Sequence, residues 1–198
     1  MTTVEGPVRL QAPRPWNMKI IAPWNESDLI AGCREGRREA LDALVAVHHD
    51  RLYRLATTLA GPEAAADLVQ ETFLAAVKSF PRFRGDAQLS TWLISILRNQ
   101  FSLFLRGRKK WKLAPLPEEG ARLPAPEPPE TDRDAREILD RVKDLPEELR
   151  TTLVLFHLDG LKYADIARVM QCPVGTVRSR LFEARGRLKR LVTKAETP

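Results

Sequence analysis

The sequence predicts an all-α protein made of two small helical domains, and three observations support this prediction. Apolar residues recur at three- and four-residue steps through most of the chain, as on the buried faces of amphipathic helices. No segment shows the apolar–polar alternation that is typical of a strand. Residues 113–134 contain six prolines and six acidic residues and predict an extended, flexible linker. We therefore expect four segments: a mobile extension at 1–25, a helical domain at 26–112, this linker at 113–134 and a second helical domain at 135–194.

The first domain is expected to hold three helices separated by proline breaks. A helix from Glu26 to Ala60 should end at Gly61-Pro62, and a helix from Glu63 to Phe80 should end at Pro81. The third helix is expected from Leu89 to Arg106. In the second helix, the pattern places Phe73 and Val77 on the packed face. Its polar positions point outward, which is also what an ordinary solvated face would show.

The second domain is expected to end in a helix-turn-helix. Asp144-Leu145-Pro146-Glu147 predicts a helix start with Asp144 as the N-cap and Pro146 in the first turn. Further on, the apolar positions of residues 163–170 are interrupted at 171–173 and resume from Val177 to Leu191. The second of these helices carries cations and hydroxyls between its apolar positions. In a helix-turn-helix, such a helix enters the major groove of DNA.

The charge of the chain favours a polyanionic partner. The net charge is +6, and seven Lys or Arg residues stand against one Glu between 174 and 194. Five further basic residues and no acid lie between 106 and 112. A generally basic surface is the alternative, but clustering of this kind favours nucleic acid.

Several other classes of function are disfavoured by the sequence. Cys33 and Cys172 lie far apart, outside any metal-ligand spacing, and suggest two thiols in a reducing compartment. His48 and His49 have no further ligands nearby, so no metal is expected. There is no Gly-rich phosphate loop or carboxylate cluster, so we expect neither a cofactor nor an enzyme. Since no apolar run is long enough for a membrane span or a signal peptide, we expect a cytoplasmic protein.

A short loop between the second and third helices combines cations with an aromatic residue. Arg82 and Arg84 flank Phe83, and Gly85 and Asp86 follow. Arginines can hold phosphates while a ring stacks on an unpaired base, so the loop suits single-stranded nucleic acid. The alternative is that Phe83 fills the core and the arginines are solvated.

Several motifs, taken in this order, resemble the bacterial RNA polymerase sigma factors of the extracytoplasmic-function (ECF) group. The similarity covers roughly residues 26 to 192, whereas a helix-turn-helix alone is shared by many regulators. The matching stretches are Asp67-Leu-Val-Gln-Glu-Thr-Phe73, Phe83-Arg-Gly-Asp86 with Thr91-Trp-Leu93, Arg98-Asn99, Leu145-Pro-Glu147 and Pro173-Val-Gly-Thr-Val-Arg-Ser-Arg-Leu181.

This resemblance implies a promoter-specificity subunit that binds core RNA polymerase, at the clamp helices of its largest subunit and the flap of its second-largest subunit. The polymerase-binding residues would be Asp67, Gln70, Glu71 and Leu74. The −10 element would be opened and a flipped base captured by Arg82, Phe83, Arg84, Gly85, Asp86, Trp92, Arg98 and Asn99. The −35 element, as duplex, would be read by Thr176, Val177, Arg178, Ser179, Arg180 and Arg185.

The resemblance also implies that the acidic linker threads the polymerase cleft and that an anti-sigma factor holds the protein. Within the helix-turn-helix, two positions depart from the family pattern: Lys162 stands where Ser or Thr often caps a helix, and Gln171 stands where Gly usually ends one. In the first domain, Ser102-Leu103-Phe104 is more apolar than the family's usual Asp-containing helix end, which suggests either core or a partner surface. Two alternatives remain. An autonomous helix-turn-helix regulator would need only the second domain and would leave residues 67–98 unexplained. An enzyme acting on nucleic acid would need a catalytic motif, and the sequence shows none.

Overall fold

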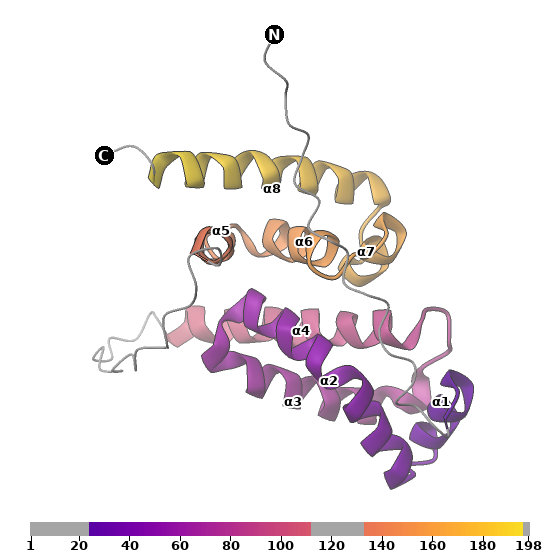
Figure 1. Ribbon diagram of the computed structural model, residues 1–198. Coiled ribbons are helices and arrows are strands. Elements are labelled where there is room, and N and C mark those ends of the chain that lie inside the picture. Colours follow the sequence, from indigo (N-terminus) through magenta and orange to yellow (C-terminus); the bar gives the residue numbers. More distant parts are fainter. Residues whose placement is uncertain (1–23, 112–132, 196–198) are drawn as a thin grey trace.

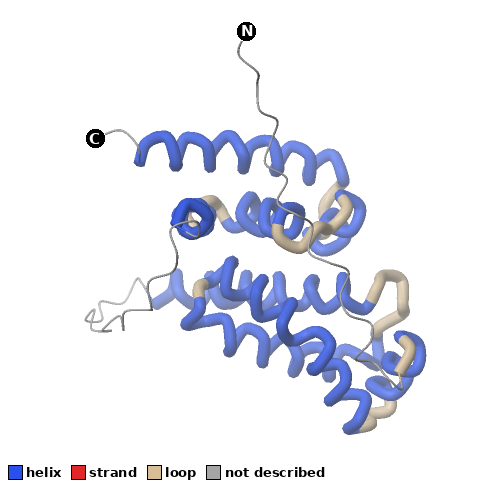
Figure 2. Tube along the Cα trace, viewed as in Figure 1, coloured by secondary structure: helices blue, strands red, loops and turns tan. Residues whose placement is uncertain are grey.

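The computed structural model describes residues 24–111 and 133–195, and all regular structure in these two ranges is helical (Figures 1 and 2). The predicted all-α fold is confirmed. The expected extension and linker fall largely at 1–23 and 112–132, outside the described residues. The elements are α1 (Glu26–Arg34), α2 (Arg38–Ala60), α3 (Pro62–Ser79), η2 (Phe80–Arg82), α4 (Leu89–Trp111), α5 (Arg133–Val142), α6 (Glu147–His157), α7 (Tyr163–Met170) and α8 (Val174–Ala195).

The first helix of the prediction is in fact two helices, so the expectation of one helix from Glu26 to Ala60 was wrong. The break falls after Arg34, where Gly36 adopts a positive φ of 72°. That left-handed conformation is easily reached by glycine and reverses the chain between α1 and α2. At the start of α1, the side chain of Asn25 accepts a 2.8 Å hydrogen bond from the Asp28 amide and acts as the N-cap.

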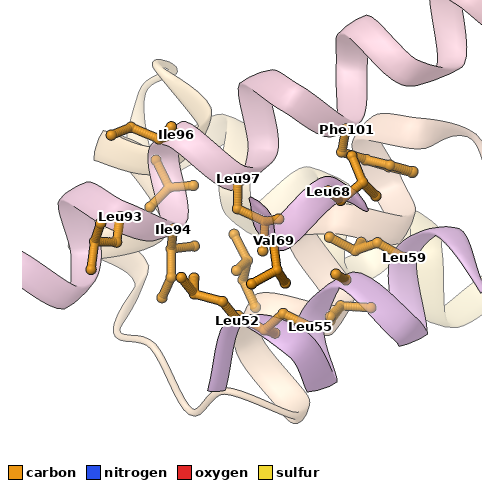
Figure 3. Packing of buried hydrophobic residues seen from close by; sticks show 14 of the residues in the cluster. Leu52, Leu55, Leu59, Leu68, Val69, Leu93, Ile94, Ile96, Leu97 and Phe101 are labelled. Carbon is orange, nitrogen blue, oxygen red and sulfur yellow. The ribbon is translucent and has the colours of Figure 1, made fainter. Parts of the chain in front are cut away.

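The core of the N-terminal half forms where α2, α3 and α4 pack together (Figure 3). Leu52 and Leu55 of α2 face Val69 of α3 and Leu97 of α4, as the three- and four-residue spacing predicted. Burial raises the pKa of the nearby Cys33 thiol in α1 to about 11, although the Arg37 charge opposes this shift. Both cysteines are free.

The C-terminal half contains the helix-turn-helix as predicted, with α7 and α8 joined by a short turn. The predicted N-cap at Asp144 was wrong: α6 begins at Glu147, and no side chain caps it. Asp144 instead donates its amide to the Arg141 carbonyl at 3.1 Å, within the turn that ends α5. The two helix-turn-helix positions that depart from the family pattern behave as their residue types predict. Lys162 provides no side-chain cap for α7, and Gln171 ends the helix in the left-handed region at φ 50°.

The two halves pack directly on each other. In Figure 1, α5 to α8 form an upper layer above α1 to α4, with α8 outermost. The contacts across the seam join α4 to α7 and α2 to α6. Among the described helices, none combines the length and apolar character that crossing a membrane requires.

Candidate nucleic-acid interface

The outer face of α3 carries the four residues that were expected to contact a protein partner. Asp67, Gln70, Glu71 and Leu74 are all exposed and follow one another at helical spacing. The opposite face of α3 is buried and includes Thr72, whose hydroxyl donates to the Leu68 carbonyl at 2.6 Å. These four residues form an exposed stripe, the α3 stripe, on a helix whose opposite side packs in the core.

Val77 does not lie on the packed face, as the apolar pattern had suggested. Its exposed fraction is 41%, and that of Leu74, one turn earlier, is 46%. The outer face of α3 thus presents two apolar side chains beside its acids and amide. A mixed surface of this kind suits a protein partner better than DNA, whose phosphates repel carboxylates.

The loop between α3 and α4 contains the predicted cations, but Phe83 is not available to stack on a base. Phe83 is only 5% exposed, and its ring lies 4.6 Å from Trp92 and 6.4 Å from Phe80, centroid to centroid. The alternative interpretation, in which Phe83 fills the core, is therefore correct. Its ring is buried against two other aromatic rings, an arrangement that stabilises the core by apolar burial and ring packing. Trp92, also expected at the DNA, is half-buried in the same cluster and lies 5.0 Å from Phe80.

The rim of this loop remains open to solvent. Arg82, Arg84, Gly85 and Asp86 are exposed, and Gly85 has a positive φ of 80° that allows the chain to turn. The aromatic cluster therefore acts as a rigid base under a rim with two cations. Such a rim can hold phosphates.

Helix α1 fixes the loop at both ends, which sequence reasoning missed. Arg34 donates a hydrogen bond to the carbonyl of Phe83. Glu26 accepts a 2.9 Å hydrogen bond from the amide of Leu89, the first residue of α4. A carboxylate at this helix N-terminus accepts a hydrogen bond from an amide that has no partner within the helix, and its charge interacts favourably with the helix dipole. These contacts join residues about 50 to 60 positions apart in sequence, and no local pattern reveals them.

Helix α8 exposes only part of its predicted contact set. Arg178 and Ser179 are exposed and Thr176 is half-buried, whereas Val177 has no exposed surface. The assignment of Val177 to DNA was wrong, because its side chain packs in the core under the helix-turn-helix. Its role is to fix the position of α8.

Phe182 is a candidate contact that the sequence analysis missed. Its side chain is 83% exposed, more than any other large apolar residue that the structure describes, and it follows Arg178 by one turn. An aromatic residue at this spacing on a cationic helix face was available as a signal. It was overlooked because the same spacing also occurs on buried faces.

The other two predicted arginines of α8 contact other side chains of the protein, although Arg185 is also exposed to solvent. Arg180 forms a 2.8 Å ion pair with Glu148 of α6. Arg185 lies over the ring of Phe156, 5.5 Å from its centroid, and 3.3 Å from Nε2 of His157. Burial and the Arg185 charge both lower the pKa of His157, which favours a neutral ring beside the guanidinium.

Arg98 of α4 is also occupied. It lies 3.2 Å from Glu148, on the carboxylate oxygen that Arg180 does not use, and 3.3 Å from the amide oxygen of its neighbour Asn99. Asn99 is exposed. The structure thus brings together one predicted residue from each DNA-binding set, Arg98 and Arg180, through a carboxylate between them. Within the described residues there is no group of three side chains suited to hold a metal ion.

Comparison with known proteins matches each half of the chain to a separate family region. Residues 44–111 match the family model "Sigma-70 region 2", and residues 135–188 match "Sigma-70, region 4". The chain is 35% identical over 169 residues to the ECF RNA polymerase sigma-E factor of Haemophilus influenzae, covering 79% of this chain and 89% of that protein.

Two solved structures share the fold. RpoE of Bartonella quintana, crystallised with the anti-sigma factor NepR, has a TM-score of 0.63 and 28% identity, and covers 77% of this chain and 96% of its own. CnrH, in complex with the cytosolic domain of CnrY, has a TM-score of 0.65 and 24% identity, and covers 85% of this chain and 97% of its own. The second likeness shows the fold alone.

Proposed function

The chain belongs to the ECF sigma factors of RNA polymerase and acts in transcription initiation, and we propose that three of its surfaces divide the work of promoter recognition. These are the outer face of α3, the rim of the loop between α3 and α4, and the exposed face of α8. None of the three requires catalysis by this chain. Each of the three surfaces lies on an element whose opposite side packs in the protein. This packing holds the surface rigid, as a binding surface requires.

The outer face of α3 carries this proposal. Asp67, Gln70, Glu71 and Leu74 are exposed together on a helix whose opposite side is buried. A regulator that only bound DNA would have no use for an acidic and apolar stripe, since such a stripe repels the phosphate backbone. We assign it to the clamp helices of the largest subunit of core RNA polymerase. The flap of the second-largest subunit is the expected partner of the C-terminal half.

Promoter DNA is assigned to the two basic surfaces. The rim residues Arg82, Arg84, Gly85 and Asp86, with Arg98 and Asn99 of α4, would act at the −10 element. Because Phe83 and Trp92 are packed on Phe80, they would support the rim and would not stack on the captured base. Arg178, Ser179 and Thr176 of α8 would read the −35 duplex, where an arginine can bond guanine in the major groove.

Two further statements follow from the family. Related structures contain anti-sigma factors, NepR on RpoE among them, and we infer that this chain also has an anti-sigma partner. We also infer that it acts in the cytoplasm, where core polymerase and promoters are found. Any path of residues 113–134 through the polymerase remains an expectation.

Reconstitution with core RNA polymerase tests the proposal. Purified core plus the full chain should initiate at specific sites on genomic DNA, whereas core alone should not. Glu71→Lys should weaken binding to core by roughly tenfold, because it reverses a charge at the centre of the stripe. Glu39→Lys is the matched control: it makes the same charge change at an exposed position of α2 and should leave core affinity unchanged.

The result also separates the sigma factor from an autonomous regulator. Specific transcription that depends on Glu71 supports the assignment of α3. If the chain fails to bind core and instead binds duplex operators tightly by itself, the autonomous regulator is correct and the proposal is wrong. Equal core affinity of the Glu71→Lys and Glu39→Lys variants would remove α3 from the polymerase contact.

A further inference from the structure

One acidic side chain stands among the cations of α8. Glu183 is the only acid in the sequence between residues 174 and 194, where there are seven Lys or Arg residues. Its side chain is 50% exposed. A carboxylate on a helix that approaches DNA is repelled by the phosphate backbone, since both carry negative charge. Glu183 is therefore unsuited to a phosphate contact, unlike the basic residues around it.

Glu183 lies on the face of α8 that points away from the core. Leu181 and Ala184, close to it in sequence, are both buried. Gly175, Ser179 and Glu183 follow one another at four-residue steps, and all three are exposed. Residues four positions apart on a helix lie one above the other on the same face. These three residues therefore form one line along the outside of α8, which we call the outer row.

The first two residues of the outer row are small. Gly175 has no side chain and Ser179 has a short one, so the backbone of α8 can come close to the base edges at these two turns. Side chains on a helix lean toward its N-terminus, so the longer side chain of Glu183 extends over the turn that contains Ser179. The carboxylate thus lies toward the N-terminal part of α8, the part of such a helix that reaches base edges in the major groove.

The carboxylate of Glu183 is held by a neighbour on the same helix. Nη2 of Arg187, one turn later, lies 2.7 Å from Oε1 of Glu183. An ordinary surface pair would look the same, because an acid four residues before a cation stabilises a helix. The Arg187 side chain is 43% exposed, however, and exposed pairs contribute little to stability. The pair therefore explains the orientation of the carboxylate better than it explains why an acid is present.

The outer row presents hydrogen-bond acceptors. The hydroxyl of Ser179 donates to the carbonyl of Gly175 at 3.2 Å, so its hydrogen is used within the helix and its oxygen can accept. An ionised carboxylate has acceptors only. Arg178, next to this row, has donors only. The exposed face of α8 therefore offers donors and acceptors at separate positions.

An acceptor in the major groove distinguishes the four bases. Cytosine presents the N4 amino donor without a neighbouring acceptor, whereas adenine presents its N6 donor beside the N7 acceptor. Guanine presents two acceptors, N7 and O6, and thymine presents the O4 acceptor and a methyl group. A carboxylate can therefore accept from cytosine without facing an acceptor on the same base, and it is repelled most strongly by guanine.

We propose that Glu183 reads a cytosine in the −35 element and that Arg187 is the positioning residue that orients its carboxylate. The inference rests on the proposed function of α8 as the helix that reads this element. It adds a negatively charged reader to the exposed arginine, serine and threonine of that helix. The repulsion between Glu183 and phosphates makes binding to unrelated duplex weaker, while the hydrogen bond to cytosine is made only at the correct sequence. Glu183 thus raises selectivity more than affinity.

The test uses core RNA polymerase loaded with the full chain. The complex binds a pool of promoter duplexes in which the upstream element is randomised, and the bound duplexes are sequenced. Wild type should enrich cytosine over guanine by roughly tenfold at one position. Glu183→Gln should change the preferred base at that position to adenine, because glutamine can accept from N6 and donate to N7. Glu183→Ala should remove the preference at that position and leave the others unchanged.

Arg187→Gln is the matched control. It removes the ion pair but keeps the carboxylate, so cytosine should remain the preferred base at that position. Binding of each variant to core polymerase, expected to equal that of wild type, shows that the variant is folded. If Glu183→Gln and Arg187→Gln alter the pool in the same way, Glu183 acts only through its ion pair and the inference is wrong.

Two further outcomes would also overturn the assignment. Glu183→Ala could leave every position unchanged, or it could remove a preference for a base other than cytosine. Either result would contradict the reading of cytosine by Glu183 while the upstream preference of wild type still supports the proposed function. A wild-type pool without any upstream preference would instead contradict the proposed function of α8, and the inference would fall with it.

Discussion

The loop rim and the α8 face are both rich in arginine, but the protein builds them in opposite ways. The rim residues Arg82 and Arg84 are exposed on a short loop, and an aromatic cluster beneath them supplies the rigidity. On α8 the helix itself is rigid, and its arginines are divided between solvent and the protein. Arg178 is exposed, while Arg180 is paired with Glu148. The same residue type is thus exposed to solvent in one place and paired within the protein in another.

This difference shows what an arginine in a basic cluster can and cannot indicate. Clustered charge indicated nucleic acid correctly at the level of the whole chain. It did not identify which cations are available, because availability depends on acids that lie far away in sequence. Glu148 is 50 positions from Arg98 and approaches it only because α4 packs on the C-terminal half.

The largest expected effect comes from removing the base of the rim. Phe80 has no exposed surface and contacts both Phe83 and Trp92, so Phe80→Ala should lower the free energy of unfolding by about 3–5 kcal/mol. Phe182→Ala is the matched control, since the same atoms are removed from a side chain that is 83% exposed. It should change stability by no more than about 0.5 kcal/mol. Urea unfolding followed by circular dichroism measures both.

Similar decreases in the free energy of unfolding for Phe80→Ala and Phe182→Ala would contradict the contrast between the loop rim and α8. A small loss for Phe80→Ala would mean that the loop is not supported by the aromatic cluster. A large loss for Phe182→Ala would mean that α8 buries this ring against another part of the protein. Either result would remove the contrast between a loop held from below and a self-supporting helix.

A smaller effect should separate the two arginines of α8. Arg178→Ala should weaken binding of the −35 duplex by about 1–3 kcal/mol, because an exposed arginine on the reading face can bond a base edge. Its effect on unfolding should be close to zero. Arg180→Ala should instead lower stability by roughly 1 kcal/mol, a modest figure because Glu148 is 42% exposed and water screens the pair. Fluorescence anisotropy with a promoter duplex and urea unfolding provide the two readouts. The distinction is wrong if Arg180→Ala leaves stability unchanged.

The sequence was sufficient for the fold class and for most of the helices. The three- and four-residue spacing predicted the helices of both halves, since amphipathic helices of ordinary length report their buried face locally. It also placed the acidic stripe of α3 on the outside. The predictions were wrong where one local sequence pattern is compatible with two structures. The helical spacing at 26–60 did not reveal the turn at Gly36, and Asp144 resembled an N-cap although its amide bonds back to α5.

The candidate sites were less predictable than the fold. Val177 and Phe83 belong to matching motifs, yet both are core residues that position their exposed neighbours. A motif includes the residues that support a contact as well as those that make it, and sequence alone does not separate them. The seam was not predictable at all, because its pairs join residues from about 45 to more than 100 positions apart.

The smallest expected effect concerns the turn that sets the angle between α7 and α8. Gln171 adopts φ 50° there, a conformation that costs a side chain with a Cβ about 1 kcal/mol, so Gln171→Gly should stabilise the protein by about 0.5–1 kcal/mol. Part of the gain is offset because glycine loses more backbone entropy on folding. Gln100→Gly in the interior of α4 is the control with the opposite sign, since helical backbone there gives glycine no advantage and should cost about 1 kcal/mol. Urea unfolding of both variants measures the difference. If both lower stability equally, the left-handed turn that ends α7 is not under strain.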